Sequence, residues 1–507
     1  MYSIIFYAGE KFKIPSYSTQ IIPISLFTGY GFAVLFNLIQ PKIMLKNTFF
    51  KEHYAIIKHL LRWTILVLPI AIAIGSMVAF FLWLLNAATF FRFSHTWLLY
   101  LLPVAGLLIH FIYHWAGKSS EKGNNLIIEE IHHEGGGVPK RMAPIILITT
   151  VITHLFGGSA GREGTAVQIG GSMAAMFGRW FKLNAVDMRM VLIAGIAAGF
   201  GAVFGTPVTG AIFAIEVLTI GRLQYDAVLP ALVASIVGDI TVSAWHITHV
   251  QYHIALYSTN PYFVADFFHA DVFLLGKVII ASVAFGLASY LFAVLVHEIK
   301  AVCIKLFKHQ WMIPVFGGLV IIALFFINGK PDYLGLGVYP QYHGAITIPS
   351  AFSTGGADTW SWLWKTIYTT ITLGTGFKGG EVTPLFYIGA TMGNTLSAWM
   401  NAPVGLFAAL GFIAVFAGAT NTPLACTFMG IELFGGEHAL LFAVACFTAY
   451  FFSGHSGIYN SQQIAVPKII DGGYADETTL SEANKRRGYM YQKLKKYRVS
   501  FRKKRDN

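Results

Sequence analysis

A glutamate between two glycines, Glu163, stands at the most chemically suggestive position in this sequence. It belongs to the run Gly161-Arg162-Glu163-Gly164, directly before the helix-like stretch TAVQIGGSMAAMF. Glycines let backbone N–H groups approach an ion, and a helix N-terminus carries a partial positive charge of about half an elementary unit. The pattern predicts an anion site that contains an acid: the ionised carboxylate can occupy the anion position, and the protonated form can leave it with a proton. The alternative is a glutamate that only caps its helix, but carboxylates inside apolar segments are functional by default.

A second glycine-rich run, Gly379-Gly380-Glu381-Val382-Thr383-Pro384, has a similar form later in the chain. Proline is favoured just inside a helix start, where a backbone N–H has no intrahelical partner in any case. The amides of Val382 and Thr383 and the Thr383 hydroxyl would then point at an ion in front of that helix. We therefore expect two helix N-termini to converge on one anion.

An internal repeat relates these two runs. Ala160–Trp180 aligns without gaps on Gly379–Trp399, and Thr206–Val217 aligns on Thr422–Leu433, so the two blocks keep their order and nearly their spacing. Paired halves of this kind are typical of transporters whose substrate site lies near the bilayer midplane, at the ends of discontinuous helices. Chance similarity among glycine-rich membrane helices is the alternative, and two separate matching blocks argue against it.

The repeat also pairs two further glutamates, Glu216 and Glu432, each at the end of a block that begins Thr-Pro. We interpret both as structural groups that bond backbone N–H groups at neighbouring helix ends, and a place in a proton path stays open as the alternative. Asp239 fits either role. The histidines and the three cysteines show no metal-ligand spacing, so neither a metal site nor a cofactor is expected.

The run Gly157-Gly158-Ser159-Ala160-Gly161 matches the G-x-S-x-G signature of serine hydrolases, with His154 close by. That signature needs a strand-to-helix turn and acid–base partners, and neither context is visible in the sequence. Glycine-serine joints are common between membrane helices. We therefore do not expect an enzyme.

The composition places these motifs in a membrane. Of the 507 residues, 55% are hydrophobic and 12% are charged, against about 25% charged in a typical soluble domain. This composition excludes a soluble globular enzyme. Apolar segments that are broken by glycine and proline predict an all-α, multi-pass membrane protein with discontinuous helices.

The net charge of +12 is concentrated at the C-terminus, where residues 485–507 carry eleven basic side chains and one acid. The rest of the chain is close to neutral, so no large positive field draws anions in. RNA binding is the weaker interpretation of this tail, and a cytoplasmic, membrane-proximal segment that follows the positive-inside bias is the stronger one. No nucleic-acid partner is expected.

Three segments are expected along the chain. Residues 1–43 fit poorly with the rest, and we interpret them as an N-terminal extension of doubtful status, with Met44 as the natural start. Residues 44–470 form the membrane domain, and residues 471–507 form the basic cytoplasmic tail. The two repeat halves cover about 97–250 and 311–465.

Taken in order, the motifs resemble those of the CLC family of chloride channels and anion/proton exchangers. The GREG run, the Thr-Pro helix that ends in glutamate, the second-half G-x-x-x-P and a late tyrosine in Gly457-Ile458-Tyr459 follow that family's order over about residues 51–468. The resemblance implies a CLC fold with two inverted structural repeats, and a homodimer with a separate pore in each subunit. It also implies that Glu163 is the gating and proton-carrying residue and that Tyr459 lines the anion site.

A segment before Glu163 extends this resemblance. The family's Gly-Ser-Gly-Ile-Pro motif, whose serine contacts the anion, corresponds here to Gly123-Asn124-Asn125-Leu126-Ile127. Asn124 stands in the place of the serine and is a strong N-cap residue whose amide can donate to an anion. The run Gly135-Gly136-Gly137-Val138-Pro139 is more similar to the family motif in its residues, but it lies too close to Glu163 in the sequence.

Three departures from the common family pattern point to one branch. Thr165 replaces the proline after GREG, Asn124 replaces the serine, and Val382 and Thr383 occupy positions that are bulkier or nonpolar in chloride-selective members. Together they resemble the fluoride-exporting branch, which implies fluoride/proton antiport across the inner (plasma) membrane of a prokaryote. Fluoride is strongly hydrated, so a site for it needs well-placed hydrogen-bond donors. A chloride-handling CLC channel or chloride/proton exchanger is the alternative.

One position leaves the proton route open. Family exchangers of the chloride type carry a second glutamate directly after the position of Glu216, and this chain has Val217 there. A cycle in which Glu163 itself swings inward after protonation is the simplest way to dispense with that glutamate. The partners implied are fluoride, protons and membrane lipid.

Overall fold

The computed structural model describes residues 30–133, 135–252, 254, 264–265, 270–469 and 478–485. The chain divides into two compact units, Met1–Arg62 and Trp63–Asn507. Of the extension expected over 1–43, residues 1–29 lie outside the described residues. So does the basic tail expected over 471–507, apart from residues 478–485.

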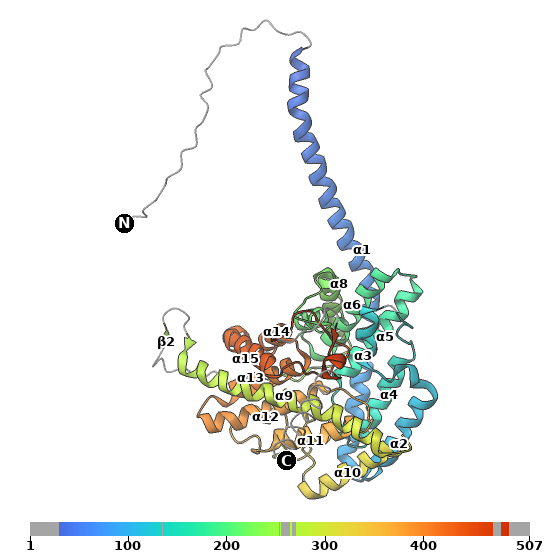
Figure 1. Ribbon diagram of the computed structural model, residues 1–507, viewed down its shortest axis with the longest axis vertical. Helices are drawn as coiled ribbons and strands as arrows, with labels where there is room; N and C mark the ends of the chain where they lie inside the picture. The colour runs from blue at the N-terminus through green and yellow to red at the C-terminus, as the bar shows by residue number, and fades with distance from the viewer. Residues whose placement is uncertain are drawn as a thin grey trace, which may run out of the picture. The chain divides into compact units, whose positions relative to one another are not determined.

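The described part of the chain is built almost entirely from helices (Figure 1). Short 3-10 or π turns join several of them. The α-helices are α1 (Tyr30–Ser94), α2 (Leu102–Ile112), α3 (Asn124–His132), α4 (Met142–Leu155), α5 (Glu163–Trp180), α6 (Ala185–Phe204), α7 (Pro207–Glu216), α8 (Val228–Ala244), α9 (Val272–Leu306), α10 (Met312–Asn328), α11 (Ser361–Gly374), α12 (Val382–Met400), α13 (Val404–Thr420), α14 (Pro423–Phe434) and α15 (Ala439–Phe452). The short turns are η1 (Thr96–Leu101), η2 (Tyr113–Gly117), η3 (Lys118–Ser120), η4 (Tyr225–Ala227), η5 (Ser350–Phe352) and η6 (Gly436–His438).

Helices of the two halves correspond in order, which confirms the expected repeat. α5 and α12 begin at the aligned glycine-rich runs, and they are followed by the matching pairs α6 and α13, then α7 and α14. Aligned glycines let neighbouring helices cross closely: a side chain on Gly170 would collide with the backbone of Gly195, and one on Gly389 with that of Gly411. Small residues at such crossings are typical of membrane helix packing.

The breaks between helices arise from local sequence. Gly205 ends α6 with φ +71°, and Asn421 ends α13 with φ +60°. Both residue types tolerate this left-handed conformation, which terminates a helix. Pro207 and Pro423 then start the next helices, because proline at the first position leaves no N–H unpaired. The result is the short helices α7 and α14, as the apolar but interrupted sequence predicts.

Two small sheets are present among the described residues. β1 (Thr219–Ile220) pairs in parallel with β4 (Gln463–Ile464), which pairs antiparallel with β5 (Thr478–Thr479). The first sheet therefore joins the segment after α7 to the segment that follows Tyr459. The second sheet pairs β2 (Val264–Ala265) with β3 (Ala270–Asp271).

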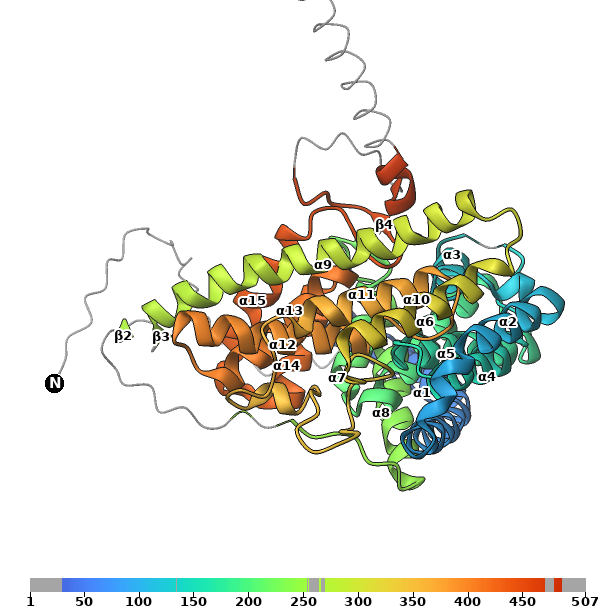
Figure 2. The same ribbon diagram turned by 90° about the horizontal axis from the view of Figure 1, so that it is seen from below.

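Several helices are long and apolar enough to cross a membrane. One of them, α9, runs lengthwise against α11, α13 and α15 (Figure 2). The stretches that meet this criterion among the described residues are Phe50–Ser94, Thr96–His132, Ala185–Phe204, Tyr225–Ala244 and Val272–Leu306.

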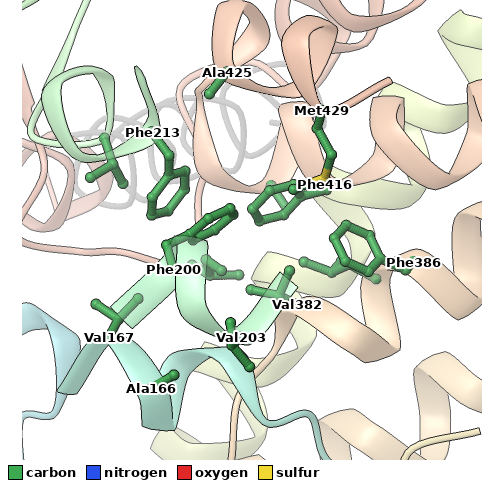
Figure 3. Packing of buried hydrophobic residues seen from close by; sticks show 14 of the residues in the cluster. Ala166, Val167, Phe200, Val203, Phe213, Val382, Phe386, Phe416, Ala425 and Met429 are labelled. Carbon is green, nitrogen blue, oxygen red and sulfur yellow. The ribbon is translucent and has the colours of Figure 1, made fainter. Parts of the chain in front are cut away.

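An aromatic cluster fills the core where the two halves meet (Figure 3). Phe200 of α6 stacks on Phe213 of α7 with ring centroids 4.3 Å apart, and Phe416 of α13 lies beside both. Phe386 of α12 stacks on Phe412 of α13 at 3.8 Å. Such stacked pairs add about 0.5–1.5 kcal/mol beyond the burial of their surface. The cluster thus fixes α12 relative to α6 and α7.

Candidate functional site

The two glycine-rich runs meet in a short antiparallel bridge between Gly161 and Gly380. The Gly161 amide donates to the Gly380 carbonyl at 2.6 Å, and the Gly380 amide donates to the Gly161 carbonyl at 2.8 Å. A Cβ on Gly380 would lie 2.7 Å from the amide nitrogen of Gly164. The backbones can approach this closely only because side chains are missing. The bridge brings the N-terminus of α5 beside that of α12.

The side chain of Glu163 crosses from the start of α5 to the start of α12 and is almost fully buried. Its Oε2 accepts hydrogen bonds from the Thr383 amide at 3.0 Å and from the Arg162 amide at 3.0 Å. The Thr383 hydroxyl donates to Oε1, and the Arg162 Nε lies 3.6 Å from the same oxygen. The carboxylate thus occupies the place in front of a helix N-terminus where an anion is favoured.

Val382, the first residue of α12, lies next to this contact and is buried, as is Thr383. The Val382 side chain belongs to the apolar cluster that also holds Phe386 and Phe416 (Figure 3). Thr383 supplies both an amide and a hydroxyl, so a single residue provides two donors. These donors hold one carboxylate here, and the same pair suits one small anion.

Asn124 lies at the start of α3, close to Gly164. Its Nδ2 is 3.1 Å from the position that a Cβ on Gly164 would take. The interpretation of Asn124 as the N-cap is wrong, because Gly123, with φ +59°, occupies that position and Asn124 is the first helical residue. Its amide is therefore free of a capping bond. The buried Oδ1 has no hydrogen-bond partner among the residues that the structure describes.

Glu381 is a neighbour of this site that the sequence reasoning missed. Its Oε2 lies 3.5 Å from the same Cβ position on Gly164 and has no partner within the described ranges. Glu381 immediately precedes α12, as Arg162 immediately precedes α5. The repeat alignment places these two residues at equivalent positions, and this exchange of a basic for an acidic side chain was the signal that could have revealed Glu381.

Tyr459 lies in the segment that follows α15 and is buried. The segment is tied to α3 by Ser461, whose amide donates to Asn125 Oδ1 at 3.0 Å and whose hydroxyl donates to Glu129 Oε1 at 2.9 Å. These two bonds position Tyr459 relative to the start of α3, where Asn124 lies.

Glu216 and Glu432 lie away from the bridge and make reciprocal contacts between the halves. Glu216, at the end of α7, accepts from the amides of Leu424 at 3.0 Å and Ala425 at 2.7 Å. Glu432, in α14, accepts from the amides of Val208 at 2.9 Å and Thr209 at 2.8 Å. Each carboxylate therefore binds the N-terminus of the equivalent helix in the other half.

The geometry does not support a serine nucleophile at Ser159. Its hydroxyl pairs with the Thr369 hydroxyl at 2.9 Å, whereas His154 Nε2 lies 3.4 Å from the Gly161 carbonyl. No group of three or more potential metal ligands lies together in the described part of the chain.

Comparisons with known proteins agree with the resemblance in the motifs. A sequence profile described as "Voltage gated chloride channel" matches residues 104–454. A protein of Pseudomonas syringae pv. tomato named "Chloride/fluoride channel protein" is 44% identical over 417 residues, which cover 82% of this chain and 90% of that protein.

Solved structures show the same arrangement of helices. The crystal structure of a CLC-type fluoride/proton antiporter matches with a TM-score of 0.74 and 32% sequence identity, over 80% of this chain and 98% of that chain. A slow cyanobacterial Cl−/H+ antiporter matches with a TM-score of 0.64 over 77% of this chain and 94% of that chain. Its sequence identity is 18%, so this second likeness shows the fold alone.

Proposed function

The chain belongs to the voltage-gated chloride channel family, also called the CLC family, and from that premise we propose that it exports fluoride from the cytoplasm in exchange for protons. Members of this family are membrane transport proteins, so the chain is a multi-pass membrane protein and not an enzyme. The observation that carries the proposal is the Glu163 carboxylate at the N-terminus of α12, held by the amide and the hydroxyl of Thr383.

Glu163 acts as the gate and the proton carrier. While ionised, its carboxylate holds the donors that an incoming fluoride needs, and so blocks the path. Once protonated it is a weaker acceptor, because charge-assisted hydrogen bonds are roughly twice as strong as neutral ones. The neutral side chain then leaves, fluoride takes its place at Thr383, and the proton moves with Glu163.

Neutral donors select the anion along this path. Asn124, Thr383 and Tyr459 offer an amide and two hydroxyls, and Val382 narrows the site without adding charge. Fluoride loses strong hydration on entry, so short, well-directed donors favour it more than they favour the larger and more weakly hydrated chloride. Chloride transport by the same path is the alternative function.

The proton leaves by a route without the second glutamate of the chloride exchangers. Val217 at that position is buried, and its carbonyl accepts from Gln462 Nε2 at 2.8 Å. We propose that protonated Glu163 itself swings inward and releases its proton on the inner side, without passing it to a second glutamate. Glu381, whose Oε2 lies 3.5 Å from the position of a Cβ on Gly164, supplies a second carboxylate at the start of that movement.

The relatives also guide the assembly and location that we propose. The chain forms a homodimer with one pore per subunit, in the inner (plasma) membrane of a prokaryote. Its basic tail lies in the cytoplasm, as the positive-inside bias predicts. Fluoride, protons and membrane lipid are its partners, and it binds no nucleic acid.

Purified protein in vesicles tests this function through simultaneous fluoride and proton fluxes, with chloride measured in parallel. We expect fluoride efflux coupled to proton uptake, and much slower chloride movement. Glu163→Gln should abolish proton coupling, whereas Glu298→Gln, at an exposed position on α9, should leave it unchanged. Chloride moving as fast as fluoride would overturn the fluoride assignment, and coupling retained in Glu163→Gln would show that another carboxylate carries the proton.

A further inference from the structure

A cavity of about 390 Å³ opens between the ends of α2, α9 and α10 and the loop before α12. Its charged lining residues are three lysines and one acid: Lys118, Lys300, Lys378 and Glu121. In the described part of the chain none of these lysines has a carboxylate within 4.0 Å. Lys378 instead lies over the ring of Tyr113, with Nζ 4.2 Å from its centroid. The cavity is therefore a concave site in which three lysines outnumber one carboxylate.

The residues around this cavity are those of a membrane interface. Trp115 beside α2 and Trp311 beside α10 are both exposed, and exposed tryptophans gather at the level of lipid headgroups. The end of α9 carries Lys305 and is followed by Lys308, which marks this end as the cytoplasmic one by the positive-inside bias. Ile304, which lines the cavity, is an exposed apolar side chain at the same helix end.

We propose that this cavity binds the headgroup of an anionic phospholipid. Its phosphate lies among Lys118, Lys300 and Lys378, and its acyl chains lie along the exposed apolar surface at the end of α9. Basic pockets between membrane helices on the cytoplasmic side are suited to such headgroups. A soluble phosphate shares the headgroup chemistry but would leave the adjoining apolar surface, which includes Ile304, uncovered. The proposal does not depend on which anion the protein transports.

The bound headgroup also contacts the segment that leads to the bridge. Lys378 precedes Gly380 by two residues, and Gly380 pairs with Gly161 beside Glu163. A phosphate at Lys378 therefore restrains the loop that starts α12. Lipid composition then bears on the site through a direct contact and not only through the bulk properties of the bilayer.

Native mass spectrometry of the detergent-purified full chain, titrated with phosphatidylglycerol, tests this proposal. We expect one lipid bound per chain, and weaker binding by about five-fold for each lysine removed, hence by about 25-fold in Lys118→Ala/Lys300→Ala. Lys305→Ala is the matched control, because Lys305 is exposed at the same end of α9 but does not line the cavity. Both mutated lysines are exposed, so the double variant should keep its melting temperature.

Two results of this titration would overturn the proposal: unchanged binding by the double variant, or equal weakening by Lys305→Ala, which would indicate diffuse attraction to a basic surface. Two further arms identify the ligand. Phosphatidylcholine should bind far more weakly, and inorganic phosphate in equal amount should not displace phosphatidylglycerol. Equal binding of phosphatidylcholine would refute selection for an anionic headgroup, and displacement by phosphate would assign the cavity to a soluble phosphate-bearing ligand.

Discussion

Replacing Glu216 tests whether the paired glutamates hold the two halves of the protein together. The alanine variant removes the acceptor for the amides of Leu424 and Ala425. Ala425 is fully buried, so water cannot replace the lost partner. Hydrogen bonds to charged groups contribute about 1.5–3 kcal/mol each. Glu216→Ala should therefore lower the free energy of unfolding by about 3–6 kcal/mol, and Glu216→Gln, which keeps one acceptor oxygen, by about half as much.

The equivalent glutamate in the other half should matter to a comparable extent. Glu432 accepts hydrogen bonds from the amides of Val208 and Thr209 and from the Thr209 hydroxyl, and Thr209 is fully buried. The structure thus predicts that Glu432→Ala lowers the free energy of unfolding by about as much as Glu216→Ala. A much smaller loss in Glu432→Ala would contradict this reasoning.

Equilibrium unfolding in mixed detergent micelles, followed by tryptophan fluorescence, measures these differences. Glu298→Ala is the control, because Glu298 is exposed on α9, and substitutions at such positions change stability by about 0.5 kcal/mol or less. The structural assignment would be refuted if Glu216→Ala were as stable as Glu298→Ala. Loss of proton coupling in Glu216→Gln at unchanged stability would instead place Glu216 in the proton path.

Three other substitutions probe the site and its support. Gly380→Ala forces a methyl group to within 2.7 Å of the Gly164 amide nitrogen. Fluoride flux in vesicles should therefore fall by about ten-fold or more. Gly276→Ala is the control, because its added methyl group would have no atom within 4 Å. Ser461→Ala removes the hydroxyl that donates to Glu129, and the KM for fluoride should rise about five-fold because Tyr459 is less firmly positioned. Lys365→Met leaves the carbonyls of Tyr333 and Gly335 without their buried donor. The free energy of unfolding in micelles should therefore fall by about 2–4 kcal/mol. For the control Lys330→Met, at an exposed position, it should fall by about 1 kcal/mol or less.

Each of these substitutions also has a result that would count against the reasoning. Unimpaired flux in Gly380→Ala would mean that the bridge relaxes without cost. An unchanged KM in Ser461→Ala would show that the backbone bond from Ser461 to Asn125 suffices to place Tyr459. Equal stability of the Lys365→Met and Lys330→Met variants would mean that water reaches the Tyr333 and Gly335 carbonyls.

The helices and their order could be predicted from the sequence because their boundaries are local. A residue able to adopt positive φ ends α6 and α13, and proline then starts α7 and α14; both signals are visible in Gly205-Thr206-Pro207 and Asn421-Thr422-Pro423. The repeat then doubles each local signal. These helices can therefore be predicted from the sequence, because the same boundary signals occur once in each half.

The side-chain contacts of the site were less accessible, because they join residues that are far apart in the chain. The contact between Glu163 and Thr383 spans 220 residues, and its direction follows only once Gly161 and Gly380 are known to pair. Asn124 was expected to cap its helix, but the positive φ of Gly123 moves the cap one residue earlier. Glu381 was missed because the repeat alignment rests on residues that the two halves share, and at this position the halves differ.

That difference between the repeats explains how two equivalent halves make one site. The residue before α5 is Arg162, and the equivalent residue before α12 is Glu381. The first residue of α5 is Glu163, and the equivalent first residue of α12 is Val382. If both halves carried the glutamate, two carboxylates would compete for the same pair of helix ends and repel each other. If both carried the valine, the donors at Thr383 would have no internal acid to displace. In the cycle that we propose, an acid at the first position of α5 and none at the first position of α12 is the smallest asymmetry that lets a carboxylate and an anion take turns, and the Gly161–Gly380 bridge holds the two helix N-termini side by side.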